Sequence, residues 1–93
     1  MRTIKYTTRF NRDYKREKSS RHGKKLDVLL MEAVNMLAAD TPVPRRYFDH
    51  PLAGEWNDYR DCHIRPDLIL IYGKRDDESL ELVRLGSHSQ LGF

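Results

Sequence analysis

Polar and apolar side chains alternate at the start of the chain, where Ile4 and Tyr6 are spaced two apart within residues 3–7. This period of two predicts a β-strand. Phe10 and Tyr14 follow, four residues apart and surrounded by polar side chains. That spacing predicts a short helix with a narrow apolar side.

A second, stronger helical pattern begins after a break at residues 19–23. The apolar residues that recur at helical spacing are Leu26, Leu29, Leu30, Ala33 and Leu37. Pro42 cannot continue a helix, so we expect this helix to end near Asp40. The apolar side is wider than that of the first helix, which indicates that it packs on the core.

Three strand-like runs follow an irregular, proline-rich connection, at residues 56–64, 68–74 and 79–85. Turn-forming residues separate them. The run at 68–74 is the most continuously apolar, which predicts a central strand buried on both faces. We therefore expect one α+β domain spanning residues 1–93, in which an N-terminal strand, two helices and a three-strand antiparallel run form a twisted sheet with the helices packed on it.

Composition narrows the class of protein. The chain has no apolar run of about 18 residues, so we expect no membrane span. The first residues lack the apolar stretch of a signal peptide. Cys62 is the only cysteine, so no internal disulfide can form, and we expect a cytoplasmic protein.

Charge is distributed unevenly along the chain. Residues 1–25 hold ten basic and two acidic side chains, a net charge of +8, whereas the remainder carries −5. Such a basic segment favours a polyanionic partner, either nucleic acid or an acidic protein. The alternative is an ordinary solvated helix face.

Three histidines and an aspartate in the second half form the candidate catalytic group: His50, His63, Asp67 and His88. They fall at the ends of the expected elements, where catalytic groups often lie, and imidazoles can both accept and donate protons near neutral pH. The same residue types could bind zinc or iron, although their spacing lacks a compact ligand motif. They could also be separate structural histidines, and the residues alone leave this open.

The second half of the chain resembles the RelE superfamily of bacterial toxins, and specifically its YafQ branch. The resemblance is carried by the segments His50-Pro51-Leu52-x-Gly54-x-Trp56-x-x-Tyr59-Arg60-Asp61-x-His63-x-x-Pro66-Asp67, Leu70-Ile71-Tyr72 and Arg84-x-Gly86-Ser87-His88-x-x-Leu91. The first half matches in its order of elements. The resemblance implies a RelE-like, microbial-ribonuclease-like fold.

The resemblance also implies an activity, that of a ribosome-dependent mRNA endoribonuclease that uses no metal or cofactor. In that chemistry a ribose 2′-OH attacks the adjacent phosphorus, which requires a base, an acid and cationic help. We expect His88 to protonate the departing 5′-oxygen, and His50 or His63, with Asp67, to activate the 2′-OH. Arg84 is the candidate for stabilising the phosphorane. Phe93 is a candidate stacking residue, although Gly92 stands before it, where the family commonly has leucine directly followed by phenylalanine.

The basic segment would then contact ribosomal RNA. Its candidate residues are Lys5, Arg9, Arg12, Lys15, Arg16, Lys18, Arg21, Lys24 and Lys25. The resemblance further implies a cognate antitoxin with an acidic tail, and operator binding only through the toxin–antitoxin complex. The alternative function is a catalytically inactive module of the same fold that binds RNA or the antitoxin.

Overall fold

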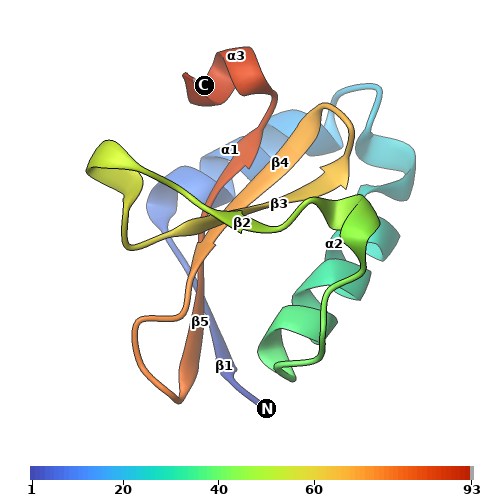
Figure 1. The fold of residues 1–93 in the computed structure, drawn as a ribbon. Helices are drawn as coiled ribbons and strands as arrows, with labels where there is room; N and C mark the ends of the chain where they lie inside the picture. The colour runs from blue at the N-terminus through green and yellow to red at the C-terminus, as the bar shows by residue number, and fades with distance from the viewer. Residues whose placement is uncertain (93) are drawn as a thin grey trace.

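The computed structural model describes residues 1–92, and its centre is a five-stranded sheet in the order β1-β5-β4-β3-β2 (Figure 1). The strands are β1 (Thr3–Tyr6), β2 (His50–Pro51), β3 (Arg60–Arg65), β4 (Leu68–Gly73) and β5 (Ser79–Gly86). β1 pairs with β5 in parallel, and the other pairs are antiparallel. The sheet therefore joins the first strand of the chain to the last.

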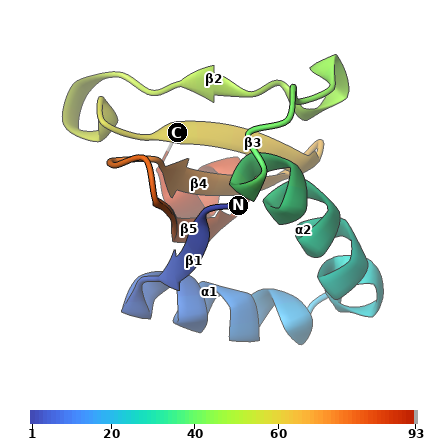
Figure 2. The same ribbon diagram turned by 90° about the horizontal axis from the view of Figure 1, so that it is seen from below.

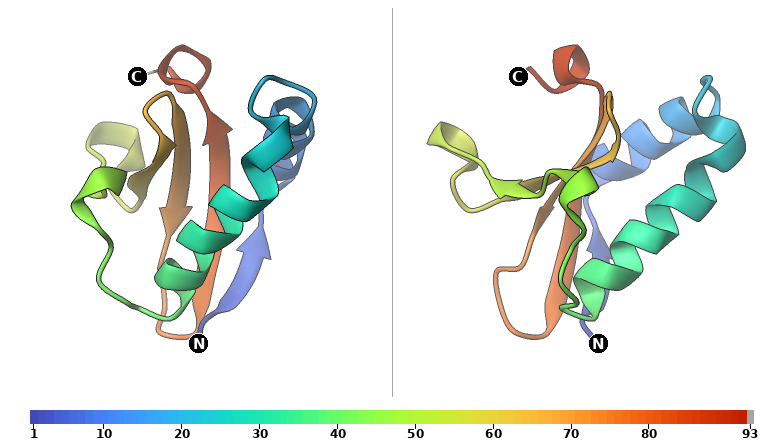
Figure 3. Two further views of the ribbon diagram at one scale, coloured as in Figure 1. Left: turned by 90° about the vertical axis from the view of Figure 1, so that its right-hand side faces the viewer. Right: turned by 45° about the vertical axis from the view of Figure 1, so that its right-hand side comes forward.

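Two long helices, α1 (Thr8–Lys18) and α2 (Gly23–Ala38), lie on the same side of the sheet, away from β2 (Figures 2 and 3). Three short helices occur in the connections and near the C-terminus: η1 (Arg45–Tyr47), η2 (Gly54–Trp56) and α3 (His88–Leu91). α3 lies at the end of the sheet opposite the N-terminus (Figure 1). Within residues 1–92, no helix is long and apolar enough to cross a membrane.

The α+β fold and its order of strand, two helices and antiparallel run are confirmed. β4 is buried at every position and has a neighbour on each side, as the apolar run predicted. The run predicted at 56–64 begins as a strand only at Arg60, because Gly54, with φ of +66°, starts a 3-10 turn before it. The two-residue strand β2 and helix α3 were not predicted.

Apolar side chains cover both faces of the sheet. Beneath α1 and α2 the main core contains Leu26, Leu30 and Leu37, together with Leu70 of β4. On the opposite face a smaller cluster is formed by Ile69, Ile71, Val83 and Leu91, with Trp56 packed against it. The smaller cluster leaves room on that face for polar side chains at the end of the sheet, and these form the candidate site.

Asp13 is buried in α1 and links that helix to the part of β5 that follows its pairing with β1. Its carboxylate accepts hydrogen bonds from Arg84 Nε at 2.7 Å, from Arg16 at 3.0 Å and from the backbone N–H of Leu85 at 3.0 Å. Burial alone would raise the pKa of Asp13, but the hydrogen bonds from Arg84 and Leu85 outweigh it and the pKa is lowered. A charged carboxylate thus accepts a backbone hydrogen bond from the part of β5 that β1 does not cover, just before the chain reaches His88.

Candidate active site

Three imidazoles from different elements converge at one end of the sheet. His50 lies in β2, His63 in β3 and His88 at the start of α3. The ring centroids of His50 and His63 are 6.4 Å apart, and those of His63 and His88 are 5.5 Å apart. The structure thus brings together histidines that are separated by up to 38 positions in the sequence.

The short strand β2 holds His50 in place. His50 stands opposite Asp61 in the antiparallel pair with β3. The preceding residue, Asp49, accepts hydrogen bonds from the Arg60 guanidinium at 3.3 Å and from the Tyr72 hydroxyl at 2.5 Å. The Asp49 contacts tie the loop to two strands, so His50 is positioned by rigid elements rather than by the loop alone.

His88 is the first residue of α3, directly after the capping residue Ser87. Its Nδ1 lies 3.1 Å from Asp67 Oδ1 in the turn between β3 and β4. This hydrogen bond lowers the pKa of Asp67. An Nδ1–H that donates to Asp67 leaves Nε2 of His88 available for proton transfer. We expected Asp67 to assist His50 or His63, but in the structure its carboxylate contacts His88.

A second carboxylate, Asp61, lies between the other two histidines and was absent from our predicted set. Its Oδ1 is 3.0 Å from His50 Nδ1 and 3.8 Å from His63 Nε2. Asp61 is 4% exposed, and burial raises its pKa. Asp61 and His63 are two apart in a strand and so share a face, which is the sequence signal that could have identified it.

Phe48 is the other site residue that the sequence did not reveal. Its side chain is 64% exposed, yet its ring centroid lies 4.8 Å from that of His50 and 5.5 Å from that of His63. Its backbone has φ of +46°, an unusual value for a bulky residue, and its carbonyl oxygen accepts a hydrogen bond from His50 Nδ1 at 2.8 Å. An exposed aromatic ring beside the imidazoles can stack on a base.

Two further predicted residues have other placements. Arg84 donates two hydrogen bonds to Asp13, and its side chain is only 14% exposed. Its guanidinium therefore already has an anionic partner in the free protein. Phe93 lies outside the described residues.

All nine predicted RNA-binding residues of the basic segment are exposed. Two of them are engaged within the protein, because Arg16 pairs with Asp13 and Glu17, and Lys18 pairs with Asp27. Arg21 extends the basic surface to the site, since it shares an open hollow of about 310 Å³ with Asp67 and contributes to lowering the Asp67 pKa. Arg21 thus brings the end of the basic segment beside Asp67, which contacts His88.

As for metal binding, the part of the chain that the structure describes contains no group of three or more His, Cys, Asp or Glu side chains arranged to hold a metal ion. The two carboxylates instead face imidazoles, with Asp61 beside His50 and Asp67 beside His88. Each pair can fix the ring orientation and stabilise an imidazolium.

Replacing Asp61 with Asn should stabilise the fold. A buried carboxylate whose pKa is raised binds more protons in the folded than in the unfolded state, so its destabilising effect appears as pH rises through the folded pKa. We expect Asp61→Asn to raise the free energy of unfolding by about 1 kcal/mol at pH 7.5 and by little at acidic pH. Thermal unfolding at the two pH values checks this; equal gains at both would contradict it.

Comparisons with known proteins give consistent results. A family model described as a bacterial toxin of type II toxin–antitoxin systems, YafQ, matches residues 2–92. The mRNA interferase toxin YafQ of Escherichia coli strain K12 is 40% identical over 91 residues, which are 97% of this chain and 95% of that protein.

Two solved structures show the same fold. The crystal structure of YafQ from E. coli strain BL21(DE3) superposes with a TM-score of 0.85 at 37% identity, covering 98% of each chain. In the crystal structure of the E. coli DinJ–YafQ toxin–antitoxin complex, the matching chain has a TM-score of 0.80 at 35% identity, with 97% of this chain and 96% of that chain covered.

Proposed function

Because this chain belongs to the YafQ family of bacterial toxins from type II toxin–antitoxin systems, we propose that it is a ribosome-dependent, metal-independent mRNA endoribonuclease. The enzyme class follows from the family, whose E. coli relatives are mRNA interferase toxins. The proposal adds the catalytic roles of the residues, the ribosome as the site of action and the cytoplasm as the location.

The partner that keeps such a toxin inactive is a cognate antitoxin. Support comes from the E. coli relative, which was crystallised as a complex with DinJ. The basic segment, with its net charge of +8, would attract an acidic antitoxin tail as well as RNA. We propose that operator DNA is bound only through the toxin–antitoxin complex.

In the proposed reaction His50 is the base. Its Nδ1 is hydrogen-bonded to the Phe48 carbonyl and lies 3.0 Å from Asp61 Oδ1, so the lone pair on Nε2 can take the proton of the ribose 2′-OH. The 2′-oxygen then bonds to phosphorus, and the bond from phosphorus to the 5′-oxygen breaks. His88, held by Asp67, gives its Nε2 proton to that oxygen, which yields a 2′,3′-cyclic phosphate and a 5′-hydroxyl.

The surrounding residues support these two histidines. Asp61 stabilises the imidazolium that forms at His50. His63, 15% exposed beside Asp61, lies between base and acid. Phe48 offers a face on which a base adjoining the scissile bond can stack. The phosphorane-stabilising role of Arg84 and the stacking role of Phe93 stay predictions.

The observation that carries the proposal is the convergence of three imidazoles, each within reach of a carboxylate. The test is to incubate the purified toxin with one mRNA, both free and bound to programmed ribosomes, in the presence of a transition-metal chelator that leaves Mg²⁺ for the ribosome. We expect cleavage only on ribosomes and no effect of the chelator. Equal cleavage of free RNA would refute ribosome dependence, and loss of cleavage with the chelator would favour a metal nuclease.

The second candidate function is an inactive module that binds RNA or the antitoxin. It is favoured by one observation, that residues 1–25 carry a net charge of +8, which could attract RNA or an acidic antitoxin without the histidines. The two functions separate in the same assay, because a binding module would associate with ribosomes but leave the mRNA intact.

Ribosome binding should depend on the exposed face of α1. Changing Arg9, Arg12 and Lys15 together to Gln removes three exposed charges while keeping the ion pairs of Arg16 and Lys18. If each contacts a phosphate, the slope of log affinity against log salt should fall by about two. Co-sedimentation with ribosomes across a salt series measures this. Arg75→Gln, in the exposed turn between β4 and β5, is the control; an unchanged slope in the triple variant would remove α1 from the interface.

A further inference from the structure

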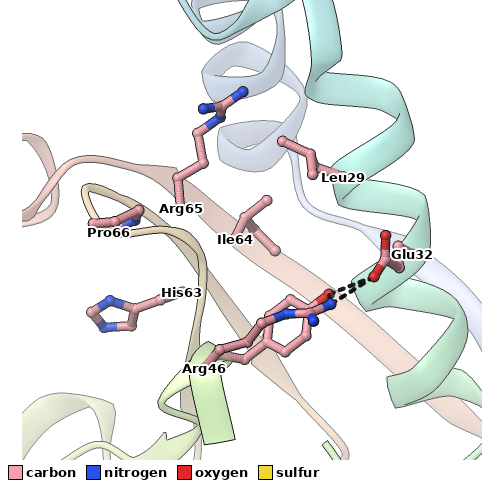
Figure 4. Close-up of a pocket in the computed structure, with 8 residues that line it drawn as sticks. Leu29, Glu32, Arg46, His63, Ile64, Arg65 and Pro66 are labelled. Atoms are coloured by element: carbon pink, nitrogen blue, oxygen red, sulfur yellow. Dashed lines mark hydrogen bonds and ion pairs between the residues drawn. The ribbon is translucent and has the colours of Figure 1, made fainter. Parts of the chain in front are cut away.

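A groove of about 590 Å³ opens beside His63, between α2 and the end of β3. It is lined by Leu29, Glu32, Arg46, Tyr47, His63, Ile64, Arg65 and Pro66. Figure 4 shows Arg65 and Arg46 at opposite ends of it, with Leu29 and Ile64 between them. The volume is in the range of small-ligand sites, roughly 300–1,000 Å³.

Arg65 reaches this groove because β3 contains a bulge. The register against β4 shifts between His63 and Arg65, so that His63 pairs with Ile69 and Arg65 with Leu68. Ile69 belongs to the smaller cluster on the catalytic face, whereas Leu68 belongs to the core beneath the helices. The bulge therefore sends two residues of one strand to different faces, with His63 in the site and Arg65 toward α2.

The two arginines that line the groove differ in their contacts within the protein. Arg46 is paired with Glu32 at 2.8 Å, the Tyr47 hydroxyl also donates to Glu32, and the Arg46 guanidinium lies over the Tyr47 ring at 4.9 Å. The Nε of Arg65 is buried and has no hydrogen-bond partner among residues 1–92. Buried donors are normally satisfied, so Arg65 is a groove-lining side chain with an unmet donor, and the rest of its guanidinium is the part that an incoming acceptor would meet.

We propose that this groove binds a nucleotide of the RNA strand adjoining the scissile bond, which extends the function proposed above to a specific subsite. The Arg65 guanidinium binds a phosphate, since its planar donors match phosphate oxygens. Leu29, Ile64 and Pro66 supply the apolar surface for the base. Arg46 lies at the far end, where it can approach the next phosphate, and His63 connects the groove to the reacting atoms.

The test uses a 2′-O-methylated trinucleotide, which lacks the attacking hydroxyl and cannot be cleaved. Titrated into ¹⁵N-labelled wild-type protein, it should shift the NMR signals of Arg65 Nε–H and of the Ile64 and Arg65 amides. Arg65→Gln and Arg46→Gln should each weaken binding about tenfold. Arg45→Gln is the matched control, because Arg45 is exposed in the same short helix and does not line the groove.

A second readout separates this subsite from the proposed function. On programmed ribosomes, Arg65→Gln should raise the toxin concentration for half-maximal cleavage about tenfold, whereas Arg45→Gln should leave it at the wild-type value. Shifts confined to other surfaces, or variants that bind like Arg45→Gln, would overturn the subsite while leaving the nuclease intact. If the wild type cleaves no mRNA but the trinucleotide still shifts Arg65, the nuclease proposal fails and the groove stands as an RNA-binding site.

Discussion

Substituting His88 with Ala should lower the rate of mRNA cleavage on ribosomes by about 10²- to 10⁴-fold, the usual contribution of a general acid. The 5′-oxygen is a poor leaving group unless it is protonated as the bond to phosphorus breaks. His88 is the imidazole whose Nδ1 is held by Asp67. The acid is its imidazolium form, in which Nδ1–H donates to Asp67 and Nε2 carries the second proton, the one that is donated. The measurement is the single-turnover rate with saturating toxin on programmed ribosomes.

The same variant should remain folded and bound. The His88 side chain is 48% exposed, and only its contacts with Asp67 and the His63 ring are lost, so thermal unfolding and ribosome co-sedimentation should match the wild type. A mRNA cleavage rate within a few-fold of the wild type, with binding unchanged, would show that His88 is not the acid. A parallel loss of binding and rate would instead assign it a contact role.

Substituting Asp13 with Ala should be among the most destabilising single changes in the chain, at about 3–5 kcal/mol. The change leaves the Arg84 guanidinium, 14% exposed, without its anion and the Leu85 N–H without an acceptor. A domain of this size has a free energy of unfolding of roughly 5–15 kcal/mol, so the loss is a large part of its stability. Urea unfolding at pH 7.5 measures the change.

The matched control is Asp27→Ala, which removes an aspartate paired with Lys18 where both side chains are about half exposed. We expect little change in stability there, because solvent screens exposed pairs. Asp13→Asn should fall between wild type and Asp13→Ala. Since the pKa of Asp13 is lowered in the fold, its contribution is present at neutral pH and declines as pH falls through that pKa. Equal effects of the Asp13 and Asp27 substitutions would contradict this account.

Much of the fold could be predicted because it depends on local periodicity. The apolar run of β4 and the helical spacing of α2 each specify an element without reference to the rest of the chain. β2 could not be predicted, since a two-residue strand that contains Pro51 exists only through its pairing with β3. α3 depends on the capping box of Ser87 and Gln90, which spans too few residues to form a periodic pattern.

The sequence indicated which residues gather at the candidate site better than which carboxylate contacts which imidazole. Which carboxylate assists which imidazole depends on the turn that carries Asp67 toward α3 and on the cross-strand pair that sets Asp61 against His50. Neither follows from spacing along the chain. Phe48 enters the site through a left-handed backbone conformation, which no preference of phenylalanine would suggest. Arg84 was assigned from the resemblance, and only the tertiary structure reveals Asp13 as its partner.

The most direct test of the central claim is to map the 5′ ends of mRNA in cells that express either wild type or His88→Ala. The account predicts new 5′-hydroxyl ends within translated regions, in phase with the codons, for wild type alone. Moving the start codon of a reporter into another frame should move the cuts with it. Cuts that keep their positions after the frame change, or that persist in His88→Ala, would contradict a ribosome-dependent nuclease whose acid is His88.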